Sequence, residues 1–347
     1  MPDIYERLRE RLDKFPQGFP KTESGVELEI LQRLFSPDEA EIMFALRPYP
    51  ELVSIVAERM NRNETELGDI LYDMSKKGEI YYFMAPWVVG IWEFQLNNLN
   101  QENIKLYEKY FEEGLIPANK KKNVAGFRAI PIEAEIKENS QVQPYEKISE
   151  IIEANSKFAV ANCICRKEAR LMGEGCDKIL ESCLSFGMAA DFYIENGMAR
   201  EISKEEALQV LKKAEEDGLV HFSSNHLGDK IFICNCCSCC CKALANITKH
   251  DNFGVIAQSN YYAVSDEETC TACEECIDRC QVFAIQMENE LAVIDRDKCI
   301  GCGLCVSTCP SDSISMVHKE PDATSPIFAD GNELMQASAN DTNKEFP

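Results

Sequence analysis

Apolar residues recur at helical spacing through the first hundred residues, and turn signals divide them into short helices. Ser36-Pro37-Asp38-Glu39 has the composition of a helix start, because serine caps the first turn, proline fits its first position and acids follow. We therefore expect one helix from this cap and two more helices, over about Glu51–Met60 and Glu64–Lys77. A hairpin should follow, with strands over Glu79–Met84 and Trp87–Trp92.

Helices followed by a two-stranded wing resemble the winged-helix domains of transcription regulators. The charges oppose DNA binding, because a recognition helix presents cations to DNA and residues 25–79 hold twelve acids against six bases. The acids of the third helix are Glu64, Glu66, Asp69 and Asp73. We expect a module that docks a protein or dimerises, with the amphipathic segment 101–114 as core or dimer face.

From about Gln143 the pattern becomes that of an α/β domain. The expected elements are a helix over about Tyr145–Asn155, a strand over Phe158–Asn162, a helix from the capping box at Ser203 to about Asp217, and a hairpin over Leu219–Phe222 and Ile231–Ile233. The helix and hairpin look like a second winged element. Both the strand and the hairpin run directly into cysteines.

These cysteines form two groups. Four fall within 21 residues and can close a loop around one metal centre: Cys163, Cys165, Cys176 and Cys183. Six fall within eight residues: Cys234, Cys236, Cys237, Cys239, Cys240 and Cys241. Neighbours such as Cys236 and Cys237 point to opposite sides of an extended chain, so one cluster cannot use all six.

Two ligand assignments remain open for these ten thiols. Either the first four hold one [4Fe–4S] cluster and the run of six supplies most or all of another, or both groups share a single cluster or a larger unusual one and leave several thiols free. Zinc is the alternative, because four thiolates suit Zn²⁺ equally well. Arg166, Lys167 and Arg170 follow the first thiols, and these cations either stabilise a reduced cluster or dock an anion, or they form a solvated helix face.

The remaining eight of the eighteen cysteines form two runs with one shared spacing, C-x2-C-x2-C-x3-C. The runs are Cys270, Cys273, Cys276 and Cys280, and then Cys299, Cys302, Cys305 and Cys309. Three thiolates on a tight loop can bind three irons of one cubane, and the fourth points towards a neighbouring cluster. Zinc sites have no use for a fourth cysteine placed in this way.

Residues 262–318 resemble the two-cluster bacterial ferredoxins through these runs. The resemblance implies two [4Fe–4S] clusters with crossed ligation, one held by Cys270, Cys273, Cys276 and Cys309, and the other by Cys299, Cys302, Cys305 and Cys280. Gln281 departs from the family pattern, which has proline there, as at Pro310. Its extra backbone N–H is expected to affect cluster potential rather than ligation.

Composition limits the classes of partner and the cellular compartment that we expect for this protein. The net charge of −23 argues against nucleic acid or anionic membrane as a partner. The N-terminus has no apolar signal region, and no stretch is long and apolar enough to span a bilayer, so we expect a cytoplasmic protein whose thiols bind metal. Without a glycine-rich nucleotide loop, NAD, FAD or ATP binding is not indicated.

The expected fold class is α+β, with three domains. The expected ranges are a winged-helix-like helical domain (1–118), a linker (119–142), a cysteine-rich α/β domain (143–258), a two-cluster ferredoxin domain (259–318) and a disordered tail (319–347). At 347 residues the chain is long enough for a core in each domain.

The pattern favours an iron–sulfur electron-transfer protein, a subunit or partner of an anaerobic oxidoreductase rather than a stand-alone enzyme. We expect two ferredoxin-type clusters, one or two further clusters and a redox partner protein, with a homo- or hetero-oligomer compatible with the pattern. No catalytic residue is indicated, and the histidines show no paired ligand spacing. The alternatives are a reductase with a substrate-binding cluster in the middle domain and a redox-sensing winged-helix regulator.

Overall fold

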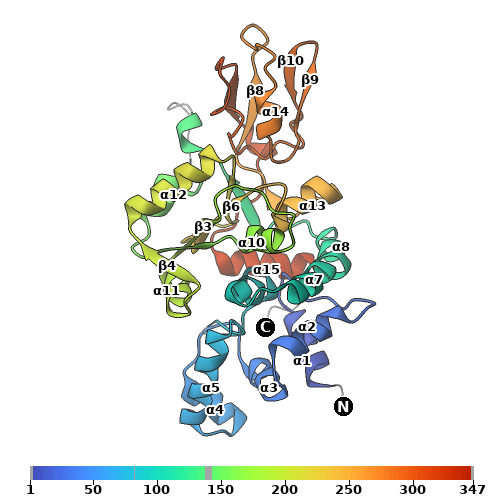
Figure 1. The fold of residues 1–347 in the computed structure, drawn as a ribbon, viewed down its shortest axis with the longest axis vertical. Coiled ribbons are helices and arrows are strands. Elements are labelled where there is room, and N and C mark those ends of the chain that lie inside the picture. The colour runs from blue at the N-terminus through green and yellow to red at the C-terminus, as the bar shows by residue number, and fades with distance from the viewer. Residues whose placement is uncertain (1–2, 82, 137–142, 345–347) are drawn as a thin grey trace. The chain divides into compact units, whose positions relative to one another are not determined.

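The computed structural model describes residues 3–81, 83–136 and 143–344. It contains both helix and sheet, as expected for the α+β class (Figure 1). The chain divides into two compact units: the first comprises 1–122, 195–198 and 335–347, and the second comprises 123–194 and 199–334. Within the described ranges, no helix is long and apolar enough to cross a membrane.

The first unit is built from helices. These are α1 (Ile4–Leu12), α2 (Val26–Leu34), α3 (Pro37–Ala45), α4 (Val53–Met60), α5 (Glu64–Lys76), α6 (Trp92–Phe94), α7 (Gln101–Tyr110) and α8 (Ile116–Asn119). The predicted helix start is confirmed, because the Ser36 hydroxyl accepts from the Glu39 N–H while the Glu39 carboxylate accepts from the Ser36 N–H. This reciprocal cap satisfies two backbone donors.

The predicted wing is wrong for the residues that the structure describes. Neither Glu79–Met84, of which Tyr82 lies outside the described residues, nor Trp87–Trp92 forms a strand. The Trp87 ring is buried against Phe19 and Tyr110, with ring centroids 5.4 and 5.9 Å away. A strand with one wet face cannot bury side chains on all sides, so these aromatic residues fill the helical core instead.

Side-chain hydrogen bonds replace the ladder that a hairpin would supply at this point. The buried Gln95 amide donates to the carbonyls of Gly78 and Ile91, at 2.8 and 3.3 Å. Backbone acceptors at both ends of the irregular segment are thereby satisfied without a partner strand. The first unit is therefore a helical unit whose described residues lack the element that would define a winged helix.

The second unit is organised around a seven-stranded sheet of order β4-β2-β3-β6-β5-β1-β7. Its strands are β1 (Phe127–Ile130), β2 (Phe158–Asn162), β3 (Glu181–Phe186), β4 (Ala199–Ile202), β5 (Val220–Ser224), β6 (Phe232–Cys236) and β7 (Ile256–Ala257). All neighbours are antiparallel except the pair β1 and β7. The predicted strand at Phe158–Asn162 and the predicted hairpin are confirmed as β2 and as β5 with β6.

The hairpin is not a second wing, because both of its strands have further neighbours. β6 also pairs with β3, and β5 also pairs with β1. Five helices accompany this sheet: α9 (Ile148–Glu153), α10 (Ile164–Leu171), α11 (Gly187–Glu195), α12 (Lys204–Glu216) and α13 (Lys242–His250). Buried apolar residues of α9 and α12 form one core cluster with those of β2, β3 and β6. The hairpin that carries the thiols is therefore held inside the sheet.

Ordered elements occupy both the expected linker and the expected disordered tail. β1 lies in the segment predicted to be a linker, and α15 (Gly331–Asp341) lies in the predicted tail. The buried Arg128 of β1 explains part of this order. Its guanidinium donates to the carbonyls of Ser325 and Pro326, at 2.7 and 3.1 Å. Polar composition predicted solvent exposure here, but the carbonyls of the tail are the partners of a buried cation.

The C-terminal part of the second unit consists of two short ribbons and a helix, shown in orange to red in Figure 1. β8 (Tyr261–Ser265) pairs with β11 (Ile314–His318), and β9 (Ile285–Glu288) pairs with β10 (Leu291–Ile294). The helix α14 (Glu275–Arg279) lies between β8 and β9 in the chain. Ile300 and Leu304 of this part share a hydrophobic core with Val220 and Phe222 of β5. The sheet and the cysteine-rich ribbons therefore pack as one unit.

Candidate metal centres

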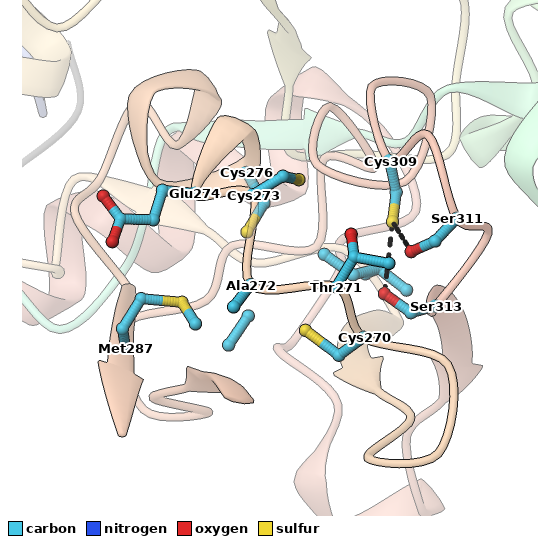
Figure 2. Close-up of a pocket in the computed structure, with 12 residues that line it drawn as sticks. Cys270, Thr271, Ala272, Cys273, Glu274, Cys276, Met287, Cys309, Ser311 and Ser313 are labelled. Atoms are coloured by element: carbon cyan, nitrogen blue, oxygen red, sulfur yellow. Dashed lines mark hydrogen bonds between the residues drawn. The ribbon is translucent and has the colours of Figure 1, made fainter. Parts of the chain in front are cut away.

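The first ferredoxin-type site is a pocket lined by cysteines from both runs (Figure 2). Cys270, Cys273 and Cys276 come from the first run, and Cys309 is the last cysteine of the second. Met287, Ala292 and Ile314 supply apolar lining. The structure therefore brings together the four side chains that crossed ligation requires. The donor set fits one cubane, because a soft iron–sulfur core takes thiolate ligands in an apolar surrounding.

Cys309 differs from its neighbours because two serines bind its sulfur. The hydroxyls of Ser313 and Ser311 lie 3.2 and 3.6 Å from its Sγ (Figure 2). Burial opposes ionisation, but these hydrogen bonds outweigh it and lower the pKa of Cys309 to about 7. Hydrogen bonds to the charged form stabilise a thiolate. Cys309 is therefore prepared for the ionised form that a metal ligand needs.

The second ferredoxin-type site is more deeply buried. Burial, with the neighbouring Cys280 and Cys299, raises the pKa of Cys302 to about 12. Burial also raises the pKa of Cys305, which is close to Cys302, Cys299 and Cys280. The Ala284 N–H donates to the Cys280 Sγ at 3.2 Å. Burial also raises the pKa of Cys280, and thiols that resist ionisation when unliganded fit a site whose charge a metal core offsets.

Six of the ten upstream thiols form a contiguous row. Its members, here called the six-thiol row, are Cys163, Cys165, Cys183, Cys234, Cys236 and Cys241. Along the row, each thiol lies close enough to the next to shift its pKa: Cys163 and Cys165, Cys165 and Cys241, Cys241 and Cys236, Cys236 and Cys234, and Cys234 and Cys183. β2 and α10 meet at the first pair, while β3 and β6 supply the far end.

The other four upstream thiols form a compact group. These are Cys176, Cys237, Cys239 and Cys240, here called the four-thiol group, and their Sγ atoms all lie within 4.8 Å of one another. Cys176 thus contacts Cys237 and Cys240, at 3.9 and 3.8 Å, instead of joining the predicted quartet with Cys163, Cys165 and Cys183. The predicted quartet is wrong in this respect, because Arg170 and Asp217 hold the loop that carries Cys176, and this loop places the Cys176 thiol beside Cys237 and Cys240.

The strand geometry explains this division. Cys234 and Cys236 are two residues apart on β6 and therefore share a face, whereas Cys237 follows on the other side. Cys240 and Cys241 separate in the same manner, one into each group. The prediction that one centre cannot use the whole 234–241 run agrees with this arrangement. The first of the two open assignments does not match the observed grouping, because Cys176 leaves the quartet, whereas the row joins cysteines of both groups, as the second assignment requires.

Arg166 is the cation beside these thiols. It is fully buried at the start of α10 and donates to the Cys237 Sγ at 3.6 Å and to the Asn235 carbonyl at 3.1 Å. Burial opposes its charge, but the thiols of Cys163 and Cys237 outweigh burial and raise the pKa of Arg166. A permanently charged guanidinium stabilises nearby thiolates. Of the two expectations for this residue, the structure agrees with charge stabilisation.

Arg170 has a different role from Arg166. Its guanidinium donates to the carbonyls of Cys176 and Lys178, at 2.9 and 2.6 Å. It therefore fixes the loop that carries Cys176 rather than a thiolate. The Asp217 carboxylate supports the same loop by accepting from the Ile179 N–H at 2.5 Å.

Gln281, the residue that departs from the ferredoxin pattern, binds the loop of the four-thiol group. Its side-chain oxygen accepts from the N–H and the hydroxyl of Ser238, at 2.9 and 3.1 Å. Ser238 lies between Cys237 and Cys239, and Gln281 directly follows Cys280. Sequence reasoning identified the position but not its partner, because the contact joins segments 43 residues apart. In the sequence, the replacement of the family's proline by Gln281 was the signal that this position has a special role.

Comparison with known proteins supports the C-terminal part of this description. Residues 263–316 match the family model described as a 4Fe-4S dicluster domain. No curated protein and no solved structure matches the chain. The matched segment, with the chain's eighteen cysteines, supports an iron–sulfur electron-transfer protein. The ten upstream thiols lie outside the match.

Proposed function

We propose that this protein passes single electrons between a partner oxidoreductase and a chain of [4Fe–4S] clusters. The observation that carries the proposal is the pocket in which Cys309 joins Cys270, Cys273 and Cys276 (Figure 2). Cysteines of both runs in one pocket are what two adjacent clusters with crossed ligands require. A [4Fe–4S] cluster supplies one-electron chemistry at a potential set by charge, hydrogen bonding and exposure.

The second ferredoxin-type cluster would be held by Cys299, Cys302, Cys305 and Cys280. Cys276 of the first site is close enough to Cys305 to raise the pKa of that thiol, after burial and the thiols of its own site. The two ligand sets are therefore adjacent, which favours electron exchange between them. The Ala284 N–H on the Cys280 sulfur would stabilise added negative charge.

The six-thiol row would hold a third cluster. A cubane takes four thiolates, so the row has enough ligands with two to spare. The row belongs to the same unit as the ferredoxin-type sites, and Cys234, Cys236 and Cys241 pack in the same hydrophobic core as Cys276, Cys299 and Cys305. A shared core would keep these centres at fixed separations, which a relay needs.

The proposal predicts a metal and sulfide content that can be counted. Anaerobically purified full-length protein should hold about twelve irons and about twelve acid-labile sulfides, for three cubanes. Dithionite or a lower-potential donor should reduce it, giving EPR signals of interacting reduced clusters. Absence of labile sulfide, or clusters that no low-potential donor reduces, would refute electron transfer. About eight irons would refute the third cluster alone.

Paired substitutions separate the ferredoxin-type sites from the row. Cys273→Ser should weaken one ferredoxin-type signal, because Cys273 lines the pocket of Figure 2, and should leave the signal of the row in place. Cys236→Ser should do the reverse, because Cys236 contacts two members of the row. If each variant reduced all signals equally while keeping its fold, the assignment to separate centres would be wrong.

A second candidate is a reductase in which substrate binds an iron of the row cluster. The surplus of thiols in the row favours this function, because a ligand set larger than four permits exchange at one iron. Added cyanide distinguishes the two functions. A relay cluster with four thiolates should give an EPR signal that cyanide leaves unchanged, whereas an open iron should bind cyanide and shift the signal.

A further inference from the structure

The four-thiol group has the dimensions of a site for one ion. Three of its Sγ–Sγ separations are 3.7, 3.8 and 3.9 Å, and no pair exceeds 4.8 Å. In a closed tetrahedral site with metal–sulfur bonds of about 2.3 Å, the sulfurs lie about 3.8 Å apart. The observed separations therefore match the edge of a single tetrahedron.

A cubane would need a wider arrangement. Each of its thiolates binds a different iron, so the cluster core keeps the sulfurs farther apart than one tetrahedral edge. Elsewhere in the described part of the chain, no other group of three or more ligands is as compact as the four-thiol group, and this includes both ferredoxin-type quartets. The same molecule thus has two kinds of cysteine spacing.

The surroundings hold these thiols in place from several elements. Cys237 and Cys240 are buried and pack with Ala214 and Leu219, which lie at and just after the end of α12. The Cys241 N–H donates to the Cys237 carbonyl at 3.0 Å and closes the turn between them. Arg170 fixes the fourth ligand by binding the Cys176 carbonyl. Ligands fixed in this way suit a closed structural site.

The charge balance also suits one divalent ion. Four thiolates around a divalent ion leave two net negative charges, and hydrogen bonds to the sulfurs disperse such charge. Arg166 supplies a buried cation within 3.6 Å of the Cys237 Sγ. Gln281 fixes the backbone of Ser238 between two of the ligands.

We propose that Cys176, Cys237, Cys239 and Cys240 bind a single tetrahedral metal ion, Zn²⁺, that contains no sulfide and lies beside the six-thiol row. Zn²⁺ favours closed four-thiolate sites and has no redox chemistry of its own. A single iron shares the same geometry. Whether it is zinc or iron, the ion would link the loop after β6 to the loop that carries Cys176. This link would hold the adjacent thiols of the six-thiol row in position.

Metal analysis of the full-length protein tests this site independently of the proposed electron transfer. The expected result is one zinc per chain in addition to the irons, with zinc X-ray absorption showing four sulfurs at about 2.3 Å. One mononuclear iron instead would keep the site and change its metal. It would appear as iron in excess of sulfide, with no iron–iron scattering from that site.

Two variants connect the ion to its ligands. Cys176→Ser and Cys239→Ser should each lose at least tenfold in retention of the ion during chelator dialysis, while labile sulfide and cluster EPR stay unchanged. Retained EPR signals show that the fold survives. Cys183→Ser, in the row, is the matched control and should keep the ion. If the first two variants lost sulfide with the metal, the group would hold a cluster. If the metal content of these two variants did not change, the four-thiol group would bind no ion. Either result overturns the proposal.

Discussion

At the scale of single residues, Glu79 shows how burial converts a carboxyl into a pH-sensitive group. It is 2% exposed, and burial, reinforced by Glu39 and partly offset by Lys77, raises its pKa to about 8. The unfolded carboxyl ionises at lower pH, so between about pH 4.5 and 8 the folded chain binds more protons. Stability is therefore expected to fall as pH rises through this window, by up to about 1.4 kcal/mol per pH unit.

Glu79→Gln should remove this slope. Chemical unfolding followed by tryptophan fluorescence reports on the right region, because both tryptophans, Trp87 and Trp92, lie in the first unit. The variant should be more stable than the parent at pH 8 and similar at pH 5. Glu112→Gln, which replaces an exposed carboxyl, should keep the parental slope. An unchanged slope in Glu79→Gln would show that another group causes it.

Arg166 and Arg170 show what sequence cannot decide about single residues. Both follow the first thiol pair on one helix, and both expectations, charge stabilisation and a solvated face, fit that pattern equally. The structure separates them, because Arg166 is fully buried against the Cys237 sulfur while Arg170 binds backbone carbonyls. Arg166 binds the carbonyl of Asn235, and Arg170 binds the carbonyls of Cys176 and Lys178. A local sequence pattern cannot indicate backbone carbonyls as side-chain partners when other segments of the chain provide them.

At the scale of elements, local signals predicted what local physics determines. The cap at Ser36, the strand at Phe158–Asn162 and the alternation of thiols along β6 all depend on neighbours a few residues away. The predicted wing was wrong because Trp87 and Trp92 satisfy a strand pattern and a buried helical core equally well. The regrouping of Cys176 was missed because the loop that carries it is positioned by Arg170 and Asp217.

The contact between α14's end and the loop after β6 gives a prediction at this scale. Gln281→Ala should leave the partly buried Ser238 N–H and hydroxyl without their acceptor, at a cost of about 1–3 kcal/mol in the free energy of unfolding. Metal retention by the four-thiol group should fall as its loop loosens. Ferredoxin-type EPR signals should remain, because Gln281 is not a ligand.

Gln286→Ala is the control for this change. Gln286 is an exposed residue of β9 whose amide binds the Glu288 carboxylate, so its loss should cost less than about 0.5 kcal/mol. Hydrogen exchange at the Ser238 amide provides a local readout and should accelerate only in Gln281→Ala. Equal exchange in both variants would mean that the Gln281 contact does not hold the loop.

At the scale of the whole molecule, two carbonyls of the tail bind a side chain that lies 197 and 198 positions earlier in the chain. The predicted boundaries placed β1 in a linker and residues 319–347 in a disordered tail, and composition supports both. Arg128 has a buried side chain with carbonyl partners in Gln258, Ser325 and Pro326. A cation inside a four-residue strand is a weak strand signal, so its partners can be identified only in the folded chain.

Arg128→Gln should therefore release the tail before it disturbs the metal centres. A shorter neutral side chain cannot reach both tail carbonyls, so limited proteolysis should cut between Lys319 and Asp330 at least several-fold faster. Mass spectrometry of the fragments locates the cut, and cluster EPR of the remaining core should be retained. Lys298→Gln is the control, because its side chain is 47% exposed and pairs only loosely with Asp295. Cutting at the parental rate would show that the tail is held by its other contacts, such as the Phe328 carbonyl with the Leu227 N–H.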